Sequence, residues 1–486
     1  MDLTRRRFLE LMGTASSATC AGCTNIPFDF DLGLTVPDVP MPEQSTAPTL
    51  AIKDPVSHAL DRVTYGARPG DYQRVSAMGI EAFIEEQLSP EKIDDSYCKK
   101  AIRRYQTIAY PAGELFEYRE TLLWNDLASA TVLRAVYSER QLYEVMVNFW
   151  TDHFNIDHTK GDCLWLKTAD DREVIRKHAM GTFPELLRAS ALSPAMLWYL
   201  DGRENRKSNP DEEPNENYAR ELLELHTLGV NGGYSQQDVM EVARCLTGWT
   251  VRSEENLFKG RVEFREENHD DEAKTVLGHE IPAGLGAEDL DRVLGIVSVH
   301  PSTANYIATK LCIRFISESP DSATIQTVAD TFLKTNGDIP STLRTLFKSE
   351  AFWASRDLKL KRPIRFVASA LRASGAKTNA GPALIEYVVK MGQAPFSYPT
   401  PDGYPDEADP WMGTLIWRWQ FGVALQQNSI PGTWTDWEKL NSVYGDDSKV
   451  MAGLLGRQPT AEEASGFHAS GMGPAFLLAS PGFQRC

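Results

Sequence analysis

The sequence predicts a mainly α-helical protein, built as a single large domain with long loops and at most a few short strands. Apolar residues recur at spacings of three and four along most of the chain, which is the period of a helix buried on one face. Strand-like alternation is scarce, and Val262–Phe264 is the best candidate for a strand. The 486 residues contain no internal repeat, and their 42% hydrophobic content is enough to form a core at this length.

The amino terminus carries the features of an export signal. Thr4-Arg5-Arg6-Arg7-Phe8-Leu9 follows the twin-arginine pattern of a polar residue, two arginines, any residue and then Phe-Leu. The weakly apolar stretch from Leu11 to Ala21 is too short and too polar to span a bilayer. We therefore assign residues 1–24 to a twin-arginine signal peptide. A basic arm on a cytoplasmic protein is the alternative.

The end of this signal resembles a lipid-attachment motif. Ala21-Gly22-Cys23 ends like a lipobox, although Cys20 stands where a leucine is expected. The motif favours a lipid anchor at Cys23 or Cys20, and ordinary cleavage nearby is the alternative. Both outcomes predict a periplasmic or cell-surface protein. Twin-arginine substrates fold in a reducing compartment, which disfavours structural disulfides, so Cys245 and Cys312 are expected to be plain buried residues.

A tether and one domain follow the signal. Residues 25–52 are rich in Pro, Ser, Thr and Asp and lack periodicity, which is typical of a tether. Helical periodicity starts at Val56, so we place the single domain at residues 53–486. Helical patterns cover residues 70–88, 115–146, 172–187, 290–315, 339–352 and 364–371. The long loops at 201–215 and 396–409 are where function is expected.

Charge and missing motifs exclude several classes of function. The formal net charge is −17, which repels phosphate backbones and anionic lipid headgroups. We therefore expect no nucleic-acid partner, and membrane contact only through a lipid anchor. The motifs HExxH, GxxxxGK[ST], GxGxxG, GxSxG and CxxCH are absent from the sequence. Their absence disfavours a zincin, a P-loop NTPase, a Rossmann enzyme, an elbow-type serine hydrolase and a c-type haem protein.

The segment from Asn215 to Gly229 is the most informative part of the chain. Asn215 is expected to cap a helix at its start, and Gly229 to end it. Glu221 and Glu224 fall on one face beside Arg220. Two carboxylates three residues apart can bind a divalent metal or share a proton. Periodicity alone favours the alternative, a solvated acidic face with i,i+4 pairs.

Two histidines are expected to point into the core. His226 falls on the apolar face of the same helix, and a hydrogen-bonded core histidine is the favoured interpretation. His153 shares a helical face with large apolar residues, namely Leu142, Met146, Phe149 and Trp150. A core role is again the more common one. Because burial shifts the pKa of an imidazole and fixes its tautomer, His153 is nevertheless a candidate ligand.

Two further segments carry ionisable residues. Ser235 followed by Asp238 predicts a variant capping box at the start of a helix that contains Arg244. A polar loop follows, with the sequence His269-Asp270-Asp271-Glu272-Ala273-Lys274. A histidine next to acids is a candidate metal site, although ionisable groups crowded into a loop are usually only solvated.

Taken together, these motifs resemble a bacterial family of unknown function, DUF 1800. The motifs that carry the resemblance are Phe149-Trp150-x-x-His153-Phe154, Pro194 to Asp201, Asn215 to Gly229, Asp238 to Trp249, His269-Asp270 with Lys274, His300-Pro301 to Lys310-Leu311, Gly392-Gln393 with Pro399-Thr400, and Ala479-Ser480-Pro481. They occur in order over residues 56–483, which implies one helical domain. Gly403-Tyr404 departs from the family's Gly-Trp, and His226 stands where relatives often have Phe. The resemblance implies no activity, but it implies an alkaline-phosphatase-like partner protein, because genes of the two families are commonly adjacent.

Two kinds of function fit these observations. The first is a metal-dependent hydrolase or transferase that acts on an extracytoplasmic anionic polymer. Its candidate metal ligands are His153, Glu221, Glu224, His269 and Asp270, and its candidate catalytic residues are Glu221, Arg220, Arg244 and Lys274. In this hypothesis the three cations neutralise anionic groups of the substrate. The second is a non-catalytic surface lipoprotein that binds a protein partner or a glycan, with the same residues forming a structural ion-pair network.

Overall fold

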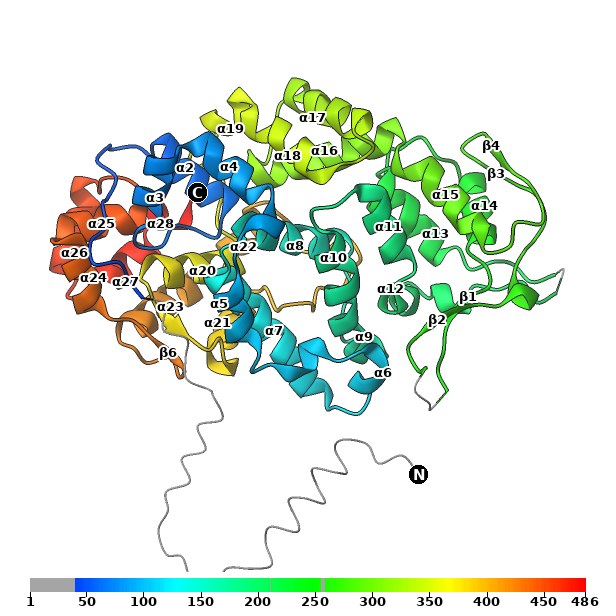
Figure 1. The fold of residues 1–486 in the computed structure, drawn as a ribbon, viewed down its shortest axis with the longest axis horizontal. Helices are drawn as coiled ribbons and strands as arrows, with labels where there is room; N and C mark the ends of the chain where they lie inside the picture. Colours follow the sequence, from blue (N-terminus) through cyan, green and yellow to red (C-terminus); the bar gives the residue numbers. More distant parts are fainter. Residues whose placement is uncertain (1–39, 210, 255–257) are drawn as a thin grey trace, which may run out of the picture. The chain divides into compact units, whose positions relative to one another are not determined.

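Helices dominate the computed structural model, which describes residues 40–209, 211–254 and 258–486 (Figure 1). Over these ranges, long loops join the helices, and the strands form three antiparallel sheets of two strands each. The mainly α-helical prediction is confirmed, and β2 (Val262–Phe264) is the strand that the sequence indicated. In the same ranges, no helix has both the length and the apolar character needed to cross a membrane. The predicted twin-arginine signal and lipobox lie outside the described residues.

The amino-terminal part of the domain contains helices up to η4, with one π-helical turn, η3. The bounds are α2 (Pro55–Val63), α3 (Asp71–Met78), α4 (Ile80–Gln87), η1 (Pro90–Lys92), α5 (Ser96–Ile102), η2 (Gln106–Ala109), α6 (Ala112–Leu115), α7 (Glu120–Tyr137), α8 (Gln141–His153), α9 (Cys163–Asp170), η3 (Asp171–Ile175), α10 (Arg176–His178), α11 (Phe183–Ala191), α12 (Pro194–Tyr199) and η4 (Gly202–Glu204). Local sequence explains several starts. In α2, the Asp54 carboxylate accepts a hydrogen bond from the Ser57 amide at 2.8 Å, and Pro55 occupies the first turn.

The middle part contains two small hairpins between helices. The bounds are α13 (Asn217–Glu221), the π-helix η5 (Leu222–Thr227), α14 (Gln236–Cys245), β1 (Trp249–Val251), β2, η6 (Glu266–Asn268), β3 (Lys274–Val276), β4 (His279–Ile281), α15 (Glu288–Ser298), α16 (Pro301–Phe315), α17 (Ser322–Lys334), α18 (Ile339–Lys348) and α19 (Glu350–Ala354). The predicted capping box at α14 is confirmed, because Ser235 and Asp238 exchange side chain to backbone hydrogen bonds. Strand β1 pairs with β2, and β3 with β4.

The carboxyl-terminal part completes the domain. The bounds are α20 (Pro363–Ala373), β5 (Lys377–Thr378), α21 (Pro382–Lys390), α22 (Asp409–Met412), α23 (Leu415–Gln426), β6 (Thr433–Trp434), α24 (Trp437–Tyr444), α25 (Asp447–Leu455), α26 (Ala461–Ala469), α27 (Gly473–Ala479) and α28 (Pro481–Gln484). Strands β5 and β6 pair in the register Lys377 to Trp434 and Thr378 to Thr433. Cys245, Cys312 and the other described cysteines are free and buried, as expected.

Residues 40–52, which the sequence assigned to the tether, pack on the domain. The Ser45 amide donates to the Val443 carbonyl at 3.0 Å, and Gln458 Nε2 donates to the Pro48 carbonyl at 2.7 Å. Lys53 Nζ then donates to the Arg485 carbonyl at 3.0 Å. Figure 1 shows the result, in which α2 and α3 lie beside α25 and α28. The domain therefore includes residues 40–52, which are 13 residues that the sequence analysis had placed in the tether.

Helix α8 positions the first of the predicted site residues. The face of α8 that packs into the core is almost entirely apolar and shielded from solvent, with Met146 and Trp150 both 0% exposed. Trp150 Nε1 donates to the Ala179 carbonyl at 3.1 Å, so the polar group of this large side chain is also satisfied. His153 is the last residue of α8, and the buried face therefore carries its ring into the interior.

Candidate functional site

A π-helical turn carries the acidic pair that the sequence singled out. The helix begins as α13 at Asn217, and Glu216 occupies its N-cap, so the helix starts one residue later than a cap at Asn215 predicts. It then widens to η5, where the Leu228 amide donates to the Leu223 carbonyl at 2.8 Å, five residues back. Single π turns inside helices are frequent at functional sites. Nothing in the sequence pattern indicated this one.

Glu221 and Glu224 are half-buried neighbours on this turn, and one of them is unpaired. The Tyr234 hydroxyl donates to Glu224 Oε2 at 3.4 Å. Among the described residues, Glu221 has no hydrogen-bond or ion-pair partner for its carboxyl group. Burial raises the pKa of the Glu221 carboxyl and the charge of Glu224 raises it further, whereas Arg220 lowers it. Arg220 itself binds Glu216 at 2.8 Å, which is the predicted i,i+4 pair.

His226 is buried on the other side of the same turn without a hydrogen bond. Its side chain is 0% exposed, and neither ring nitrogen has a partner among the described residues. Burial lowers the pKa of His226 to about 3, and the charge of Lys310 adds to this effect. The predicted burial is correct, but the predicted hydrogen bond is wrong, because the ring packs on Phe154 with centroids 5.1 Å apart. An unpartnered buried imidazole is energetically costly, and such groups need an explanation.

His153 lies next to His226 and has one free acceptor. Its Nε2 donates to the His226 carbonyl at 3.1 Å, which places the second lone pair on Nδ1. Nδ1 has no partner among the described residues. Burial lowers the pKa of His153 well below its usual value, and Lys310 and His226 lower it further. Both imidazoles are therefore neutral near pH 7.

Helix α16 adds two polar residues that sequence analysis did not select. Tyr306 lies with its ring centroid 6.2 Å from that of His153, and Lys310 Nζ lies 5.5 Å from the Tyr306 centroid. Burial raises the pKa of Tyr306 to about 12, and Asp402 and Glu224 contribute. Lys310 forms no ion pair with a described residue. Burial lowers its pKa, although nearby carboxylates act in the opposite direction. Its place in the motif ending Lys310-Leu311 was the only sequence signal that could have indicated it.

Glycine allows α16 to approach the π turn. Gly229 has a φ of +83°, and a Cβ atom there would lie 3.0 Å from Cδ2 of Tyr306. This glycine therefore ends the helix, as predicted, and also makes room for the tyrosine ring. A larger residue at this position would push Tyr306 away from Glu224.

The long loop 396–409 closes the cluster, in agreement with the expectation that loops carry function. Asn155 Nδ2 donates to the carbonyls of Tyr398 and Thr400 at 2.9 and 2.8 Å. Gly403 has a φ of +76° and lies so close to α8 that a Cβ atom would be 2.0 Å from the Asp152 carbonyl oxygen. This anchoring holds the exposed Asp402 near enough to raise the pKa of Glu221 and Tyr306. We call His153, Glu221, Glu224, His226, Tyr306, Lys310 and Asp402 the Glu221 cluster.

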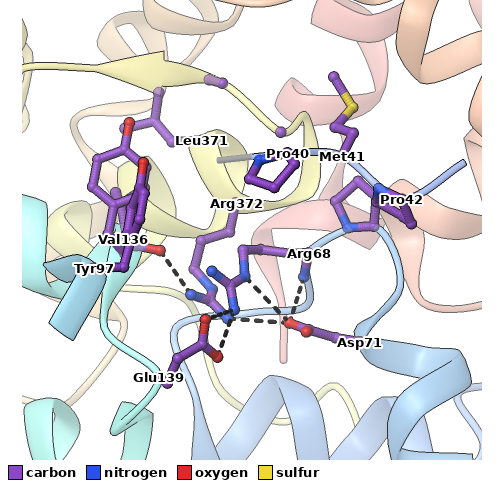
Figure 2. Close-up of a pocket in the computed structure, with 14 residues that line it drawn as sticks. Pro40, Met41, Pro42, Arg68, Asp71, Tyr97, Val136, Glu139, Leu371 and Arg372 are labelled. Atoms are coloured by element: carbon purple, nitrogen blue, oxygen red, sulfur yellow. Dashed lines mark hydrogen bonds and ion pairs between the residues drawn. The ribbon is translucent and has the colours of Figure 1, made fainter. Parts of the chain in front are cut away.

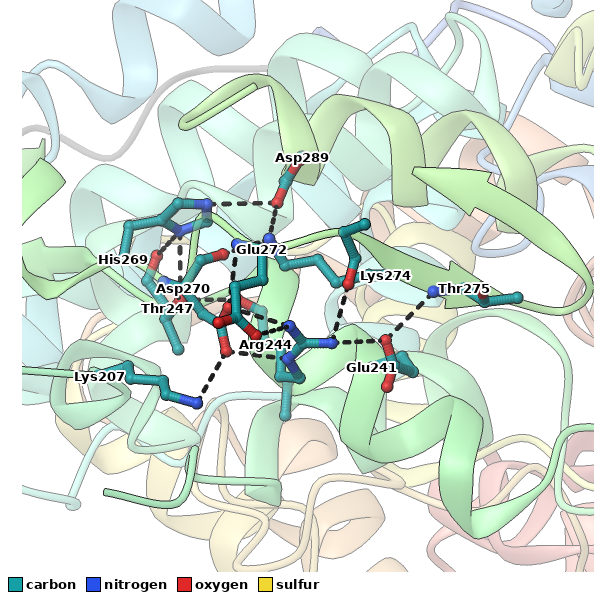
Figure 3. A network of polar contacts seen from close by, with 12 residues as sticks. Lys207, Glu241, Arg244, Thr247, His269, Asp270, Glu272, Lys274, Thr275 and Asp289 are labelled. Atoms are coloured by element: carbon teal, nitrogen blue, oxygen red, sulfur yellow. Dashed lines mark hydrogen bonds and ion pairs between the residues drawn. The ribbon is translucent and has the colours of Figure 1, made fainter. Parts of the chain in front are cut away.

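The remaining predicted residues belong to a different group, which we call the Arg244 network (Figure 3). Its members are Lys207, Glu241, Arg244, Thr247, His269, Asp270, Lys274 and Asp289. Arg244 binds Asp270 through two hydrogen bonds of 2.8 and 3.0 Å and Glu241 through one of 2.9 Å. Hydrogen bonds from Arg244 and Lys207 hold the pKa of Asp270 far below its usual value, although burial opposes them.

The other half of the Arg244 network is centred on Asp289. Lys274 Nζ lies 2.5 Å from Asp289 Oδ2, and His269 Nε2 lies 3.2 Å from the same oxygen. The His269 Nδ1 atom donates to the Thr247 carbonyl at 2.9 Å. The predicted roles of Arg244 and Lys274 in binding an anionic substrate are therefore not supported, because carboxylates already neutralise both cations. Arg220 is likewise occupied by Glu216.

The predicted metal ligands do not form one coordination shell. Over the described ranges of the chain, no group of three or more His, Cys, Asp and Glu side chains is arranged to hold a metal ion. His269 and Asp270 are directed to Asp289, Arg244 and Lys207 instead, and His153 binds a carbonyl. The described residues thus offer no ligand set that fits a divalent metal.

A cavity of about 340 Å³ elsewhere in the domain has a structural explanation (Figure 2). Figure 2 shows the guanidinium groups of Arg68 and Arg372 beside Asp71 and Glu139. Arg372 is 2% exposed, and it donates to the carbonyls of Gly66 and Val136 and to Asp71. Two carboxylates therefore match two guanidinium groups, and the cavity wall is electrically neutral.

Comparison with known proteins identifies a family but does not supply an activity. The model of a family described as "Protein of unknown function (DUF1800)" matches residues 58–485. Curated proteins and solved structures gave no match. The match covers nearly the whole described domain, and the chain belongs to this family.

Proposed function

We propose that this member of the DUF1800 family is an exported hydrolase or transferase that acts on a polysaccharide, with Glu221 and Glu224 as its acid–base pair. The observation that carries the proposal is the unpaired, half-buried carboxyl of Glu221 beside the hydrogen-bonded carboxyl of Glu224. Two neighbouring carboxyl groups in different environments are a common basis for acid and base roles in one site. Glu221 is the general acid, because its raised pKa favours the protonated form.

The other members of the Glu221 cluster support these roles. Tyr234 orients the Glu224 carboxylate through its hydroxyl hydrogen bond, so Glu224 is the base that activates water or an acceptor hydroxyl. Lys310 forms no ion pair with a described residue, and it is available to donate a hydrogen bond to the leaving-group oxygen, where negative charge develops as the glycosidic bond breaks. The buried rings of His153 and His226 provide a rigid base under the π turn.

This assignment narrows the substrate that the sequence suggested. An extensively anionic polymer requires several free cations, whereas Arg220, Arg244 and Lys274 are all paired with carboxylates. Glu221, Glu224 and Asp402 also make the site acidic. We therefore propose a polysaccharide whose reacting sugar is neutral. No step is assigned to a metal, because the described side chains offer no fitting ligand set.

The catalytic proposal is tested with Glu221→Gln and Glu224→Gln variants of the full-length protein. Release of reducing ends is measured on the neutral polymers cellulose and chitin, which are the expected substrates, and on the anionic polymers alginate and carrageenan, which are expected to remain uncleaved. Each variant is expected to lose roughly 10²- to 10⁴-fold in kcat on the polymer that the wild type cleaves. The matched control is Glu81→Gln, an exposed position on α4, which keeps full activity. Equal activity of wild type and both variants would contradict the proposal.

A binding function is the second candidate, and the Arg244 network is the observation in its favour. That network matches its carboxylates with cations, as a purely structural role requires. If the wild type cleaves none of the four polymers but retains one of them in affinity electrophoresis, the binding function replaces the catalytic one. An alkaline-phosphatase-like protein would then be the partner to test in a pull-down.

Export is a separate part of the proposal. The Arg5→Lys, Arg6→Lys double variant keeps the charge but removes the twin-arginine motif. It is expected to accumulate in the cytoplasm, as measured by fractionation and immunoblotting. Palmitate labelling of the wild type, with Cys23→Ser and Cys20→Ser as comparisons, distinguishes a lipid anchor from simple cleavage. Unchanged export of the double variant would refute the twin-arginine assignment.

A further inference from the structure

The surface of α5 is basic, although the chain as a whole is strongly acidic. Residues 92–104, which include α5, contain five Lys and Arg side chains against two Asp, in a protein whose formal net charge is −17. The side chains of Lys99, Lys100 and Arg103 are exposed. None of these three forms an ion pair with a described residue. Free cations gathered on one surface are typical of a site that binds an anionic partner.

The two aspartates that precede α5 do not neutralise these cations. Asp95 is 8% exposed, and its carboxylate accepts hydrogen bonds from the Glu139 amide at 2.8 Å and the Ser138 hydroxyl at 3.1 Å. Asp94 is exposed, and its carboxylate accepts from the Ser96 amide at 3.1 Å and the Ser96 hydroxyl at 2.9 Å. Each carboxylate therefore has its own donors, and the cations of α5 are left to solvent.

Helix α5 lies where the described part of the chain begins. Tyr97 of α5 and Pro40 line the same cavity, as Figure 2 shows. Sixteen residues lie between Pro40 and Cys23, which is a proposed site of lipid attachment. A stretch of this length spans at most about 58 Å. A lipid on Cys23 therefore keeps α5 close to the surface of the bilayer that holds it.

Screening by salt makes the local charge of α5 more important than the charge of the whole protein. The Debye length is about 8 Å at physiological ionic strength, so acidic residues on distant parts of the domain act only weakly at α5. Each Lys or Arg beside an anionic bilayer strengthens binding roughly 5-fold. Because a lipid anchor already holds the domain at the bilayer, the contact through α5 becomes intramolecular and needs little affinity of its own.

We propose that α5 is a docking surface for a bilayer of anionic phospholipids, in which Lys99, Lys100 and Arg103 bind the phosphates of the headgroups. The sequence predicted membrane contact only through a lipid anchor, and this second contact goes beyond it because it turns one chosen surface of the domain toward the membrane. That orientation in the cell rests on the proposed anchor. The affinity of α5 for anionic lipid does not, and it is separate from the chemistry of the Glu221 cluster.

The test measures co-sedimentation of the full-length protein with two kinds of vesicle, phosphatidylcholine alone and phosphatidylcholine mixed with phosphatidylglycerol. Every protein in the test carries five background substitutions, so that neither a lipid nor the basic residues of the amino terminus contribute: Cys20→Ser, Cys23→Ser, Arg5→Gln, Arg6→Gln and Arg7→Gln. With α5 unchanged, this background protein is expected to bind the mixed vesicles more tightly than the neutral ones, and added salt is expected to remove the difference.

The α5 variant adds Lys99→Gln, Lys100→Gln and Arg103→Gln to this background. Its binding to the mixed vesicles is expected to be weaker by roughly 100-fold, which is about 5-fold for each charge removed. Its binding to the neutral vesicles is expected to stay the same, because the headgroups there carry no net charge.

A matched control removes three exposed cations from α15, α17 and α18, which changes the net charge by the same amount: Arg292→Gln, Lys334→Gln and Lys348→Gln. This control is expected to bind the mixed vesicles as the background protein does, and thermal unfolding confirms that each variant is folded. Equal binding of the background protein to both kinds of vesicle, an unchanged α5 variant, or an equal loss in the control would each overturn the proposal. Absence of binding to either kind of vesicle would overturn it too and would favour an acidic protein partner. Palmitate labelling tests the lipid anchor separately, so the two failures are distinguishable.

Discussion

The Glu221 cluster and the Arg244 network contain the same kinds of side chain, but they differ in how their charges are matched. In the Arg244 network, Asp270 is 3% exposed and bound by Arg244 and Lys207. In the Glu221 cluster, neither Glu221 nor Lys310 forms an ion pair with a described residue. Matched charges stabilise the folded structure. Unmatched buried charges raise its free energy, and a functional role is a common reason why such residues are present.

This difference shows that a motif residue can be given a role only after its surroundings are known, in particular whether its charge is already paired. Arg244, Asp270 and Lys274 belong to family-like motifs as much as Glu221 does. Only the structure shows that the first three stabilise the β3–β4 region and that Glu221 is left available. The comparison therefore predicts opposite consequences of substitution in the two regions.

The largest effect on stability is expected for Asp270→Asn, which leaves Arg244 partly unmatched in a buried position. Breaking a buried ion pair by removing one partner costs about 3–5 kcal/mol. The free energy of unfolding is measured by urea titration at pH 7, with Glu221→Gln as the comparison. Because its folded-state pKa is depressed, Asp270 contributes stability above its ordinary pKa, and this contribution is lost as the pH falls. A loss for Asp270→Asn no greater than that for Glu221→Gln would break the comparison.

The next largest effect is expected for His226→Phe at acid pH. The folded-state pKa of His226 is about 3, below the ordinary 6.5, so the unfolded chain binds the extra proton first. Stability from the neutral ring is complete above pH 6.5 and is lost as the pH falls toward about 3. The Phe variant lacks this loss, so its advantage grows to a few kcal/mol, on the order of that for a fully buried group. Parallel unfolding curves of both proteins between pH 7 and pH 4 would contradict the account.

A large part of the fold could be predicted from sequence, and the reason is physical. Helical periodicity and local caps depend on neighbouring residues, so most of the helical stretches named up to residue 371, the Ser235 capping box and strand β2 were predicted correctly. The helices from α21 to α28 were not predicted. The π turn was not predicted either, because no local residue pattern marks its extra residue, and the turn contacts α16, which is distant in the sequence. Tyr306 and Lys310 were missed for a related reason. Contacts between residues about 80 positions apart leave no periodic signal in either segment.

A smaller effect, opposite in sign to that of His226, is expected for Glu221. Its folded-state pKa is raised, so the folded protein binds the proton more readily, and stability falls as the pH rises through that pKa. Glu221→Gln removes this fall. The variant is therefore expected to gain stability relative to wild type between pH 4.5 and pH 7, by less than about 1 kcal/mol for a half-exposed group. Thermal unfolding across this range measures the gain, and a steady relative loss would refute it.

The smallest effect is expected for Arg220→Lys. The pair with Glu216 has side chains that are 40% and 26% exposed, so solvent screens it. Exposed i,i+4 pairs contribute about 0.3–0.5 kcal/mol, and lysine keeps part of that. Urea unfolding and polysaccharide cleavage are both expected to be close to those of the wild type. A large loss of cleavage at unchanged stability would instead give Arg220 the catalytic role that its position in the motif suggested.

The most direct test of the central claim is the titration of the Glu221 carboxyl group itself. Glutamate labelled with ¹³C at the side-chain carboxyl is incorporated, and chemical shifts are followed between pH 3 and pH 8 in wild type and Glu221→Gln. We predict one carboxyl that titrates above the ordinary glutamate value, that is absent from the Glu221→Gln spectrum, and whose midpoint falls in Glu224→Gln. An assigned Glu221 signal that titrates at or below the ordinary value would contradict its role as the proton donor.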